Sequence, residues 1–507
     1  MTLDDLPAFP EIDVFTPDER KAIMIVREGK SEDAPVELAM RNLFIYAILS
    51  CASDVHLSGH GDRQKPMIHI SVRTPKQLQD FHYREARGKH FETKLFQLTA
   101  TPQGGSTPDM LSTRFAMELP ARFARQHGLT PKKDAQGRDR SYLVSIRVEY
   151  IRTYDGFAFV CRLLDQQRTP GLLDLGLSYA MLRAIRRAIA EPSGLILVSG
   201  PTGSGKTTLL YAILDLLNDG LRSITTIENP VEYQLEVRGP TKQIEVRGEI
   251  TFARALRSTL RQDPEIILVG EIRDTATMEI AMQAAQTGHL VLATLHANSG
   301  PETLSRALDL TPDKQRDAFR LAELVKFVMA QRLLDRFEGE SNDHPVAADE
   351  ASWLQTNGLG FIKRIPHTDS STKCGKAALI EAYSMTANMK DAVRSGHLNS
   401  SDIYRFACEQ PQYETLASAG VRAVQGLGCS IRACMTGLES TSEAAQTPGL
   451  RARLAREHGL TLVEVADVID AWCRAEDRVG SYSDTDGDRA AQPIEAFIRP
   501  VNLRVAA

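Results

Sequence analysis

Hydrophobic residues follow one spacing in the first third of the chain and another beyond it. Up to about residue 165, an apolar helical pattern at 36–52 is followed by a turn and by runs of alternating apolar and polar positions, at 67–73, 141–151 and 156–165. Alternation is typical of half-buried strands, so this part predicts an α+β domain.

Beyond residue 172, short continuous apolar runs alternate with amphipathic helical segments. The runs are GLILVS, SITTIE, EIILVG and LVLATLHA. This order predicts parallel strands joined by crossover helices, which is a doubly wound α/β sheet. Further along we expect an exposed loop at 338–350, helices at about 376–437, and a helical region at 447–479 followed by a flexible stretch.

A chain of 507 residues is too long for one ordinary core, so several domains are expected. Proline, glycine and polar residues mark a change of composition near residue 165 and predict a linker there. We expect an N-terminal arm at 1–40, an α+β domain at 41–165, a linker at 166–172, an α/β domain at 173–440 and a helical C-terminal extension at 441–507.

Composition narrows the class of protein. Hydrophobic residues make up 42% and charged residues 25%, which are near globular averages, and the formal charge of -5 favours neither nucleic acid nor an anionic membrane. The seven cysteines form no CxxC pair, which indicates a reducing cytoplasm and no structural zinc. The sequence has no signal-peptide pattern and no long apolar run, so a cytoplasmic location is expected.

The segment GPTGSGKTT, residues 200–208, lies between a predicted strand and a predicted helix. Small residues let consecutive backbone N–H groups approach one phosphate, and the helix N-terminus adds positive potential. Lys206 supplies charge to the β and γ phosphates, the Thr207 hydroxyl binds Mg²⁺, and Thr208 reaches the phosphate chain. A glycine-rich turn without a ligand is the disfavoured alternative. The predicted nucleotide-binding residues are Gly200, Pro201, Thr202, Gly203, Ser204, Gly205, Lys206, Thr207 and Thr208.

Other polar side chains follow the ends of predicted strands. Glu271 comes after IILVG, and Glu228 and Glu232 come at and beyond the end of ITTIE. The carboxyl ends of parallel strands meet at one edge of a sheet, so these carboxylates are expected near the phosphate loop. One of Glu228 and Glu232 is a candidate base for the attacking water, and surface charge at a turn is the alternative. His296 ends another strand and is a candidate sensor of the γ-phosphate.

Four segments in order resemble the Walker A, Asp box, Walker B and His box of the type II/type IV secretion ATPases, the GspE, PilB and PilT group. They are GPTGSGKTT, ITTIENPVEY, RSTLRQDPEIILVGEIRD and TGHLVLATLHANS. The resemblance spans roughly residues 41–440 and implies a RecA-like P-loop ATPase domain after a smaller, PAS-like α+β domain. It also implies ATP and Mg²⁺ as ligands, with Thr207 and Glu271 at the metal and Glu228, Glu232 and His296 as site residues.

The same resemblance implies a hexameric cytoplasmic ring that works with an inner-membrane platform protein. In that family, paired arginines of the N-terminal domain reach the nucleotide of a neighbouring subunit, and Arg147 and Arg162 stand at the matching positions. The alternative is that both arginines lie on a sheet face, paired with Glu149 or Asp165. No specific nucleic-acid partner is expected.

Some features depart from the family pattern or leave its branch open. Asn229 stands where the Asp box usually has aspartate, and the four-cysteine zinc module of the export branch is missing. KCGKAALIEAYSM and the segment YETLASAGVRAVQGLG resemble the assembly and export branch. A retraction ATPase, a DNA-linked translocation ATPase and a non-catalytic nucleotide-gated scaffold are the alternatives. The C-terminal helix with Trp472 either covers the core or docks a partner.

Overall fold

The computed structural model divides the chain into two compact units, residues 1–169 and 170–507. Residues 1–33 of the expected arm and 166–170 of the expected linker lie outside the described residues. The structure describes residues 34–60, 67–74, 78–84, 92–93, 95–96, 109–131, 137–165, 171–339, 341–368, 372–395, 400–438, 449–480, 494 and 497–498.

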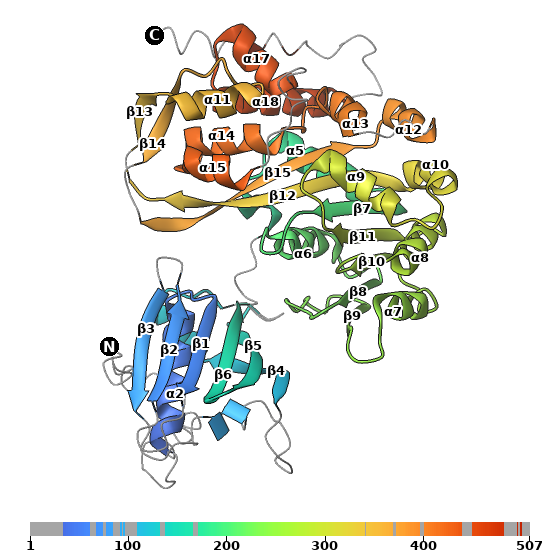
Figure 1. The fold of residues 1–507 in the computed structure, drawn as a ribbon. Coiled ribbons are helices and arrows are strands. Elements are labelled where there is room, and N and C mark those ends of the chain that lie inside the picture. Colours follow the sequence, from blue (N-terminus) through green and yellow to red (C-terminus); the bar gives the residue numbers. More distant parts are fainter. Residues whose placement is uncertain are drawn as a thin grey trace. The chain divides into compact units, whose positions relative to one another are not determined.

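The first unit is a six-stranded antiparallel sheet in the order β3-β2-β1-β6-β5-β4 (Figure 1). Its helices and strands are α2 (Ala34–Leu49), β1 (Asp54–His60), β2 (Met67–Arg73), β3 (Leu78–Arg84), β4 (Met110–Leu119), α4 (Ala121–Gln126), β5 (Tyr142–Thr153) and β6 (Gly156–Asp165).

The core of this unit lies between the sheet and α2. Leu43 and Phe44 of the helix are buried in one cluster with alternate residues of the strands, such as Val55 and Leu57. Alternation of this kind was the expected signal, and it is present in β5 and β6. Two details differ from the expectation. Helix α2 begins at Ala34 and so crosses the expected boundary at residue 40, and the expected turn at 52–59 forms β1 by pairing with both β2 and β6.

The second unit contains a seven-stranded sheet in the order β15-β12-β7-β11-β10-β8-β9. Strands from β12 to β9 in this order are parallel, whereas β15 is antiparallel to β12. The expected doubly wound sheet is therefore present. Its first elements are η3 (Leu172–Leu175), α5 (Tyr179–Ile189), β7 (Gly194–Ser199), α6 (Lys206–Leu217), β8 (Ile224–Glu228), β9 (Thr241–Glu245), α7 (Phe252–Thr259), β10 (Ile266–Val269), α8 (Thr275–Gln286), β11 (Leu290–Leu295), α9 (Gly300–Asp309) and α10 (Lys314–Leu324).

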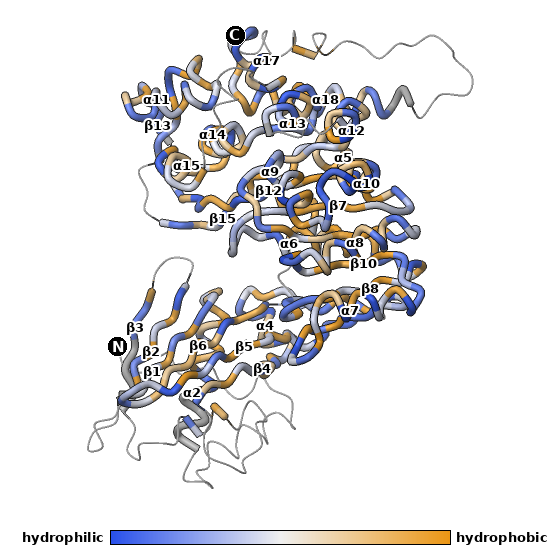
Figure 2. The backbone as a smooth tube through the Cα atoms, turned by 45° about the vertical axis from the view of Figure 1, so that its right-hand side comes forward, coloured by the Kyte–Doolittle hydropathy of each residue, from blue (hydrophilic) through white to orange (hydrophobic). Residues whose placement is uncertain are grey.

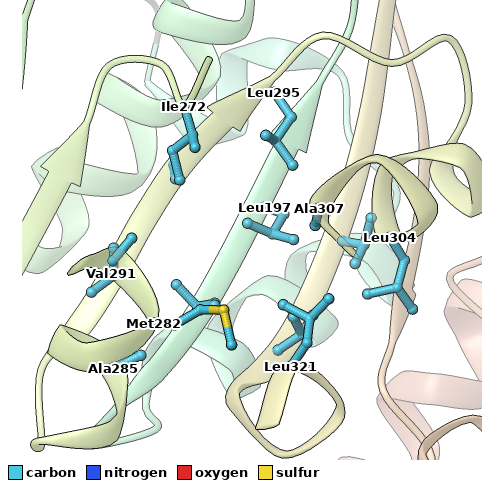
Figure 3. Close-up of a cluster of buried hydrophobic side chains, with 14 of the residues drawn as sticks. Leu197, Ile272, Met282, Ala285, Val291, Leu295, Leu304, Ala307 and Leu321 are labelled. Carbon is cyan, nitrogen blue, oxygen red and sulfur yellow. The ribbon is translucent and has the colours of Figure 1, made fainter. Parts of the chain in front are cut away.

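Successive residues of a strand point to opposite faces of the sheet, and helices cover both faces. On one side Leu197 of β7 packs with Met282, Leu304 and Leu321 from α8, α9 and α10 (Figure 3). On the other side Ile196 packs with residues of α5 and α6. Figure 2 shows the resulting hydrophobic positions along the central strands. This two-sided core holds the strand ends rigidly, which fixes the loops that follow them.

The C-terminal part differs from the sequence-based expectation. The expected helix from 376 is strand β15 up to Ser384, and the expected loop at 338–350 contains a strand and the start of a helix. Pairing with the long strand β12 overrides the helix preference of the alanine-rich segment. The remaining elements are β12 (Val325–Phe337), β13 (Ser341–Pro345), α11 (Ala348–Thr356), β14 (Arg364–Thr368), β15 (Lys373–Ser384), α12 (Ala387–Arg394), α13 (Ser400–Ala407), α14 (Leu416–Leu427), α15 (Ile431–Gly437), α17 (Leu450–His458) and α18 (Leu462–Gly480).

Helices α17 and α18 belong to the same compact unit as the sheet (Figure 1). Leu454, Val465 and Ile469 share a buried cluster with Leu379 of β15, and Trp472 packs against that cluster while partly buried. The described part of the C-terminal extension therefore covers the core. Among the described helices, none is both long enough and apolar enough to cross a bilayer.

Candidate functional site

The loop expected to bind phosphate joins β7 to α6 at residues 200–205. Gly200 and Gly205 have positive φ angles of 144° and 85°. A Cβ atom on Gly200 would lie 2.5 Å from the backbone oxygen of Gln331, and one on Gly205 would lie 2.7 Å from the Gln331 side-chain amide. Only glycine fits such close packing with this backbone conformation, so the loop stays tight and its N–H groups stay accessible.

Lys206 begins α6 and folds back over this loop. Its Nζ donates hydrogen bonds to the carbonyl oxygens of Gly200 and Pro201, at 2.7 and 2.9 Å. Burial lowers the pKa of Lys206, the nearby Arg332 lowers it further, and Glu271 and Glu232 act in the opposite direction. Four charged groups from different segments of the chain therefore lie around the loop.

Glu271 follows β10 and is mostly buried, with 19% of its side chain exposed. Its Oε2 lies 2.8 Å from Nε of Arg273 and 3.7 Å from Nε2 of His296, which follows β11. The Thr294 hydroxyl of β11 donates to the carbonyl oxygen of Gly270. The structure thus brings Glu271 and His296 together, as parallel neighbouring strands predict.

Glu228 ends β8 and is only 3% exposed. The Tyr211 hydroxyl of α6 donates to its Oε1 at 2.7 Å. Burial raises the pKa of Glu228, although the hydrogen bond from Tyr211 acts against this. Glu232 lies in the following loop and is partly exposed. The two carboxylates therefore differ in solvation, and Glu228 is not the surface charge that the alternative interpretation required.

An open cleft of about 550 Å³ lies beside the loop. Gly200 to Thr202, the segment from His296 to Asn298, and Glu302 and Arg306 of α9 line it. Thr207 and Thr208, in the first turn of α6, are partly buried, and the Thr208 hydroxyl lies 3.4 Å from that of Tyr233. The predicted loop residues, Glu271 and His296 thus lie at one edge of the sheet.

Arg332 of β12 is a site residue that the motifs did not reveal. It is 9% exposed, and its Nη2 donates to the backbone oxygen of Asn298 at 2.7 Å, in the loop just after His296. It also lowers the pKa of Lys206. The signal available in the sequence was a charged residue inside the apolar run VMAQRLL, where an uncompensated charge is costly.

A second missed residue, Glu381 of β15, holds the start of α9. It is 3% exposed, accepts from the Gly300 backbone N–H at 2.6 Å and accepts from the Tyr413 hydroxyl at 2.6 Å. Burial raises the pKa of Glu381. A carboxylate at a helix N-terminus is favoured by the helix dipole. Glu381 therefore attaches the loop between His296 and α9 to strand β15 of the sheet.

Arg147 and Arg162 lie in the first unit as direct cross-strand neighbours on β5 and β6. Arg147 forms an ion pair with Glu149 at 2.7 Å, as the alternative interpretation expected. Arg162 pairs with Asp54 at 2.9 Å rather than with Asp165. Asp165 instead accepts a hydrogen bond from Tyr142. Both arginines are partly exposed, so their charges are available to a ligand.

The chain is similar in sequence to known proteins of one family. The family described as type II/IV secretion system protein matches residues 138–434, more than half of the chain. A putative type II secretion system protein E of Escherichia coli K12 is 38% identical over 288 residues, which cover 55% of this chain and 57% of that protein. The type IV pilus assembly ATPase PilB of Acinetobacter baylyi is 35% identical over 339 residues, covering 65% and 52%. The chain thus spans little more than half the length of these relatives.

Among solved structures, the Legionella pneumophila ATPase DotB superposes with a TM-score of 0.55 at 20% identity, covering 78% of this chain and 94% of that one. This likeness concerns the fold alone and confirms the expected RecA-like α/β architecture preceded by a smaller α+β domain. The family match confirms the resemblance that the four sequence motifs indicated. The chain belongs to the type II/IV secretion system protein family.

Proposed function

We propose that this protein is a motor ATPase that binds MgATP at the loop of residues 200–208 and hydrolyses it. The observation that carries the proposal is the convergence of Lys206, Glu271 and His296 at one sheet edge, beside an open cleft. Open sheets of this class bind ligands at this edge. The PilB relative is named as an ATPase, which supports the same activity.

The residues present fit a triphosphate and a magnesium ion. Glycines keep the backbone close and accessible at the loop, and the positive end of α6 points at it. Lys206 donates hydrogen bonds to loop carbonyl oxygens in this structure. When ATP binds, it would donate instead to oxygens of the β and γ phosphates. Thr207 and Glu271 would hold Mg²⁺, Glu271 through a water molecule. When bound, Mg²⁺ supplies positive charge to the phosphate oxygens.

Two carboxylates are candidates for the base that takes a proton from the attacking water. Glu228 is buried, and its raised pKa brings it closer to the range in which a carboxylate is an effective base at neutral pH. Glu232 is more exposed and acts on the charge of Lys206. His296, whose Nε2 lies near Glu271, is placed to sense the γ-phosphate through a hydrogen bond.

Coupling to mechanical work requires more than one copy of the chain. In our proposal, a hexameric cytoplasmic ring places Arg147 and Arg162 of one copy at the nucleotide of the next. Guanidinium groups stabilise the charge of the phosphoryl-transfer transition state, which makes hydrolysis depend on closure of the ring. The ring would act with an inner-membrane platform protein. The PilB relative is named as a pilus assembly ATPase, which favours assembly or export over retraction.

A phosphate-release assay with and without DNA tests the activity. We expect wild-type turnover that depends on Mg²⁺ and is unchanged by DNA. Lys206→Ala and Glu271→Gln should each lower it at least a hundredfold, because each removes charge stabilisation at the phosphates. Lys242→Ala and Glu279→Gln, on exposed positions of the same unit, should keep it.

Two outcomes would contradict this proposal. Tight ATP binding without phosphate release would indicate a nucleotide-gated scaffold. Strong stimulation by DNA would indicate a DNA-linked translocation ATPase instead.

A further inference from the structure

A buried arginine outside the nucleotide site has two N–H groups without a hydrogen-bond partner. Arg451, in the first turn of α17, is 3% exposed. Its Nη2 donates to the backbone oxygen of Pro411 at 3.1 Å, whereas its Nε and Nη1 have no hydrogen-bond partner. None of the described carboxylates forms an ion pair with it. Burial lowers the pKa of this guanidinium, whereas the charges of Glu414 and Asp470 act in the opposite direction.

Arg451 is one of the residues that line a small cavity of about 20 Å³. Two helix N-termini meet there, since the cavity is lined by Thr415 and Ser418 at the start of α14 and by Gly449 and Ala452 at the start of α17. The N-terminus of α17 has no side-chain cap, because its N-cap residue is Gly449. Both helix dipoles therefore add positive potential to the cavity.

The nearest acidic side chain is already engaged. Glu414 lines the same cavity, but its carboxylate lies 3.0 Å from Nε of Arg422 and accepts from the Ser418 hydroxyl at 3.2 Å. An arginine cannot shed its proton to escape burial, and an uncompensated buried cation is costly. A water molecule would satisfy the two free N–H groups but would add no negative charge beside the two cations Arg451 and Arg422.

We propose that this cavity binds one monatomic anion, chloride under cellular conditions. Its volume is close to the roughly 10–15 Å³ that a single water needs, so the space matches a monatomic ion better than phosphate or sulfate. The free Nε–H and Nη1–H groups of Arg451 and the N-terminal turns of α14 and α17 supply the donors. Glu414, neutralised by Arg422, does not repel the ion strongly.

This site lies where the C-terminal extension joins the rest of its unit. Helix α17 lies beyond residue 434, where the family match ends. Helices α17 and α18 pack in the same buried cluster as α14. Bound chloride would therefore stabilise the packing of α17 against α14. The inference is independent of the proposed nucleotide chemistry.

The first test measures thermal unfolding of the full chain in sodium chloride and in sodium gluconate at equal ionic strength. A ligand that binds only the folded state stabilises it with the logarithm of its concentration. We expect the unfolding temperature to rise by about 2 °C for each tenfold increase in chloride above saturation, relative to gluconate. Arg451→Met should abolish this difference. Arg453→Met should keep it, because Arg453 is paired with Glu409 at the surface. Equal unfolding temperatures of the wild type in both salts would overturn the proposal.

The second test needs no variant and so does not depend on whether Arg451→Met folds. Crystals of the wild-type protein grown or soaked in sodium bromide should show an anomalous bromide peak within hydrogen-bond distance of Arg451 Nε and Nη1. A peak that refines as water, with no anomalous signal, would overturn the proposal. A bromide peak that persists at millimolar halide would support a specific site. A peak seen only at much higher halide concentration would indicate an adventitious ion only and would overturn the proposal.

Discussion

Glu228 shows at the scale of single residues how burial changes the chemistry of a carboxylate. It is 3% exposed and its Oε1 accepts a hydrogen bond from Tyr211. Burial raises its pKa because the charged form loses solvation that the neighbouring polar side chains do not fully replace. Burial therefore gives Glu228 a pKa suited to a general base, and the same burial makes its ionisation destabilise the folded state.

This cost predicts a pH-dependent effect of Glu228→Gln. Because the pKa of Glu228 is higher in the folded than in the unfolded chain, its contribution to stability is present below the unfolded pKa and is lost as pH rises through the folded pKa. Glutamine resembles the protonated acid, so Glu228→Gln should be more stable than the wild type at pH 8 and close to it at about pH 4, below the unfolded pKa. Urea unfolding at both pH values measures this.

The matched control is Glu232→Gln, a partly exposed position in the loop that follows β8. It should leave the unfolding midpoint nearly unchanged at both pH values. A Glu228→Gln protein less stable than the wild type at pH 8 would contradict the account of burial. Loss of turnover in this variant alone would then mark Glu228, rather than Glu232, as the base.

Much of the candidate site could be predicted from the sequence, because its residues sit at strand ends. Lys206, Glu271 and His296 each follow an apolar run, and parallel strands bring such ends together. Arg332 and Glu381 could not be predicted in this way. They lie inside strands β12 and β15, and their partners Asn298 and Gly300 are distant in sequence, so no local motif marks them.

At the scale of elements, helix α18 stabilises the beginning of α5. The Asp470 carboxylate accepts from the backbone N–H groups of Tyr179 and Ala180, at 2.8 and 3.0 Å. Arg183 of α5 forms ion pairs with Glu476 and Asp477 at 2.9 and 2.8 Å. An acidic group that caps a helix N-terminus satisfies free donors and interacts favourably with the dipole. The C-terminal extension thus acts as a distant cap on α5.

Asp470→Ala should therefore lower the free energy of unfolding by about 1–2 kcal/mol, the usual effect of losing a capping carboxylate. Chemical denaturation followed by circular dichroism measures the change. Asp467→Ala is the control, because Asp467 is exposed on the same helix. If both variants lose the same stability, α18 contributes through helix propensity and not through the cap.

The elements themselves were predicted best where local pattern and tertiary environment agree. The parallel strands β7, β8, β10 and β11 are apolar runs buried on both faces, and their pattern identified them. The parallel strands β9 and β12 were not predicted. Strand β15 was predicted wrongly, because KAALIEA favours a helix and only pairing with β12 makes it a strand. Strands β3 and β4 of the first unit were not predicted, although β4 alternates Leu111, Phe115 and Leu119 with polar residues.

At the scale of the whole molecule, the proposed activity depends on two units with separate contributions. The second unit carries the phosphate loop, and the first carries Arg147 and Arg162 as cross-strand neighbours. Their ion pairs with Glu149 and Asp54 are partly exposed, and such pairs contribute little stability, so the guanidinium groups can exchange partners. The central claim is that these arginines act on the nucleotide of another copy.

Mixing two inactive variants tests that claim most directly. Lys206→Ala chains keep the arginines but not the phosphate-binding lysine, whereas Arg147→Ala/Arg162→Ala chains keep the lysine alone. In an equal random mixture, about a quarter of the contacts between copies join an intact loop to intact arginines. Copurification of differently tagged chains confirms that mixed assemblies form. We predict phosphate release at about a quarter of the wild-type rate from the mixture and almost none from either variant alone. A mixture as inactive as its components, or full turnover by the double arginine variant, would contradict the account.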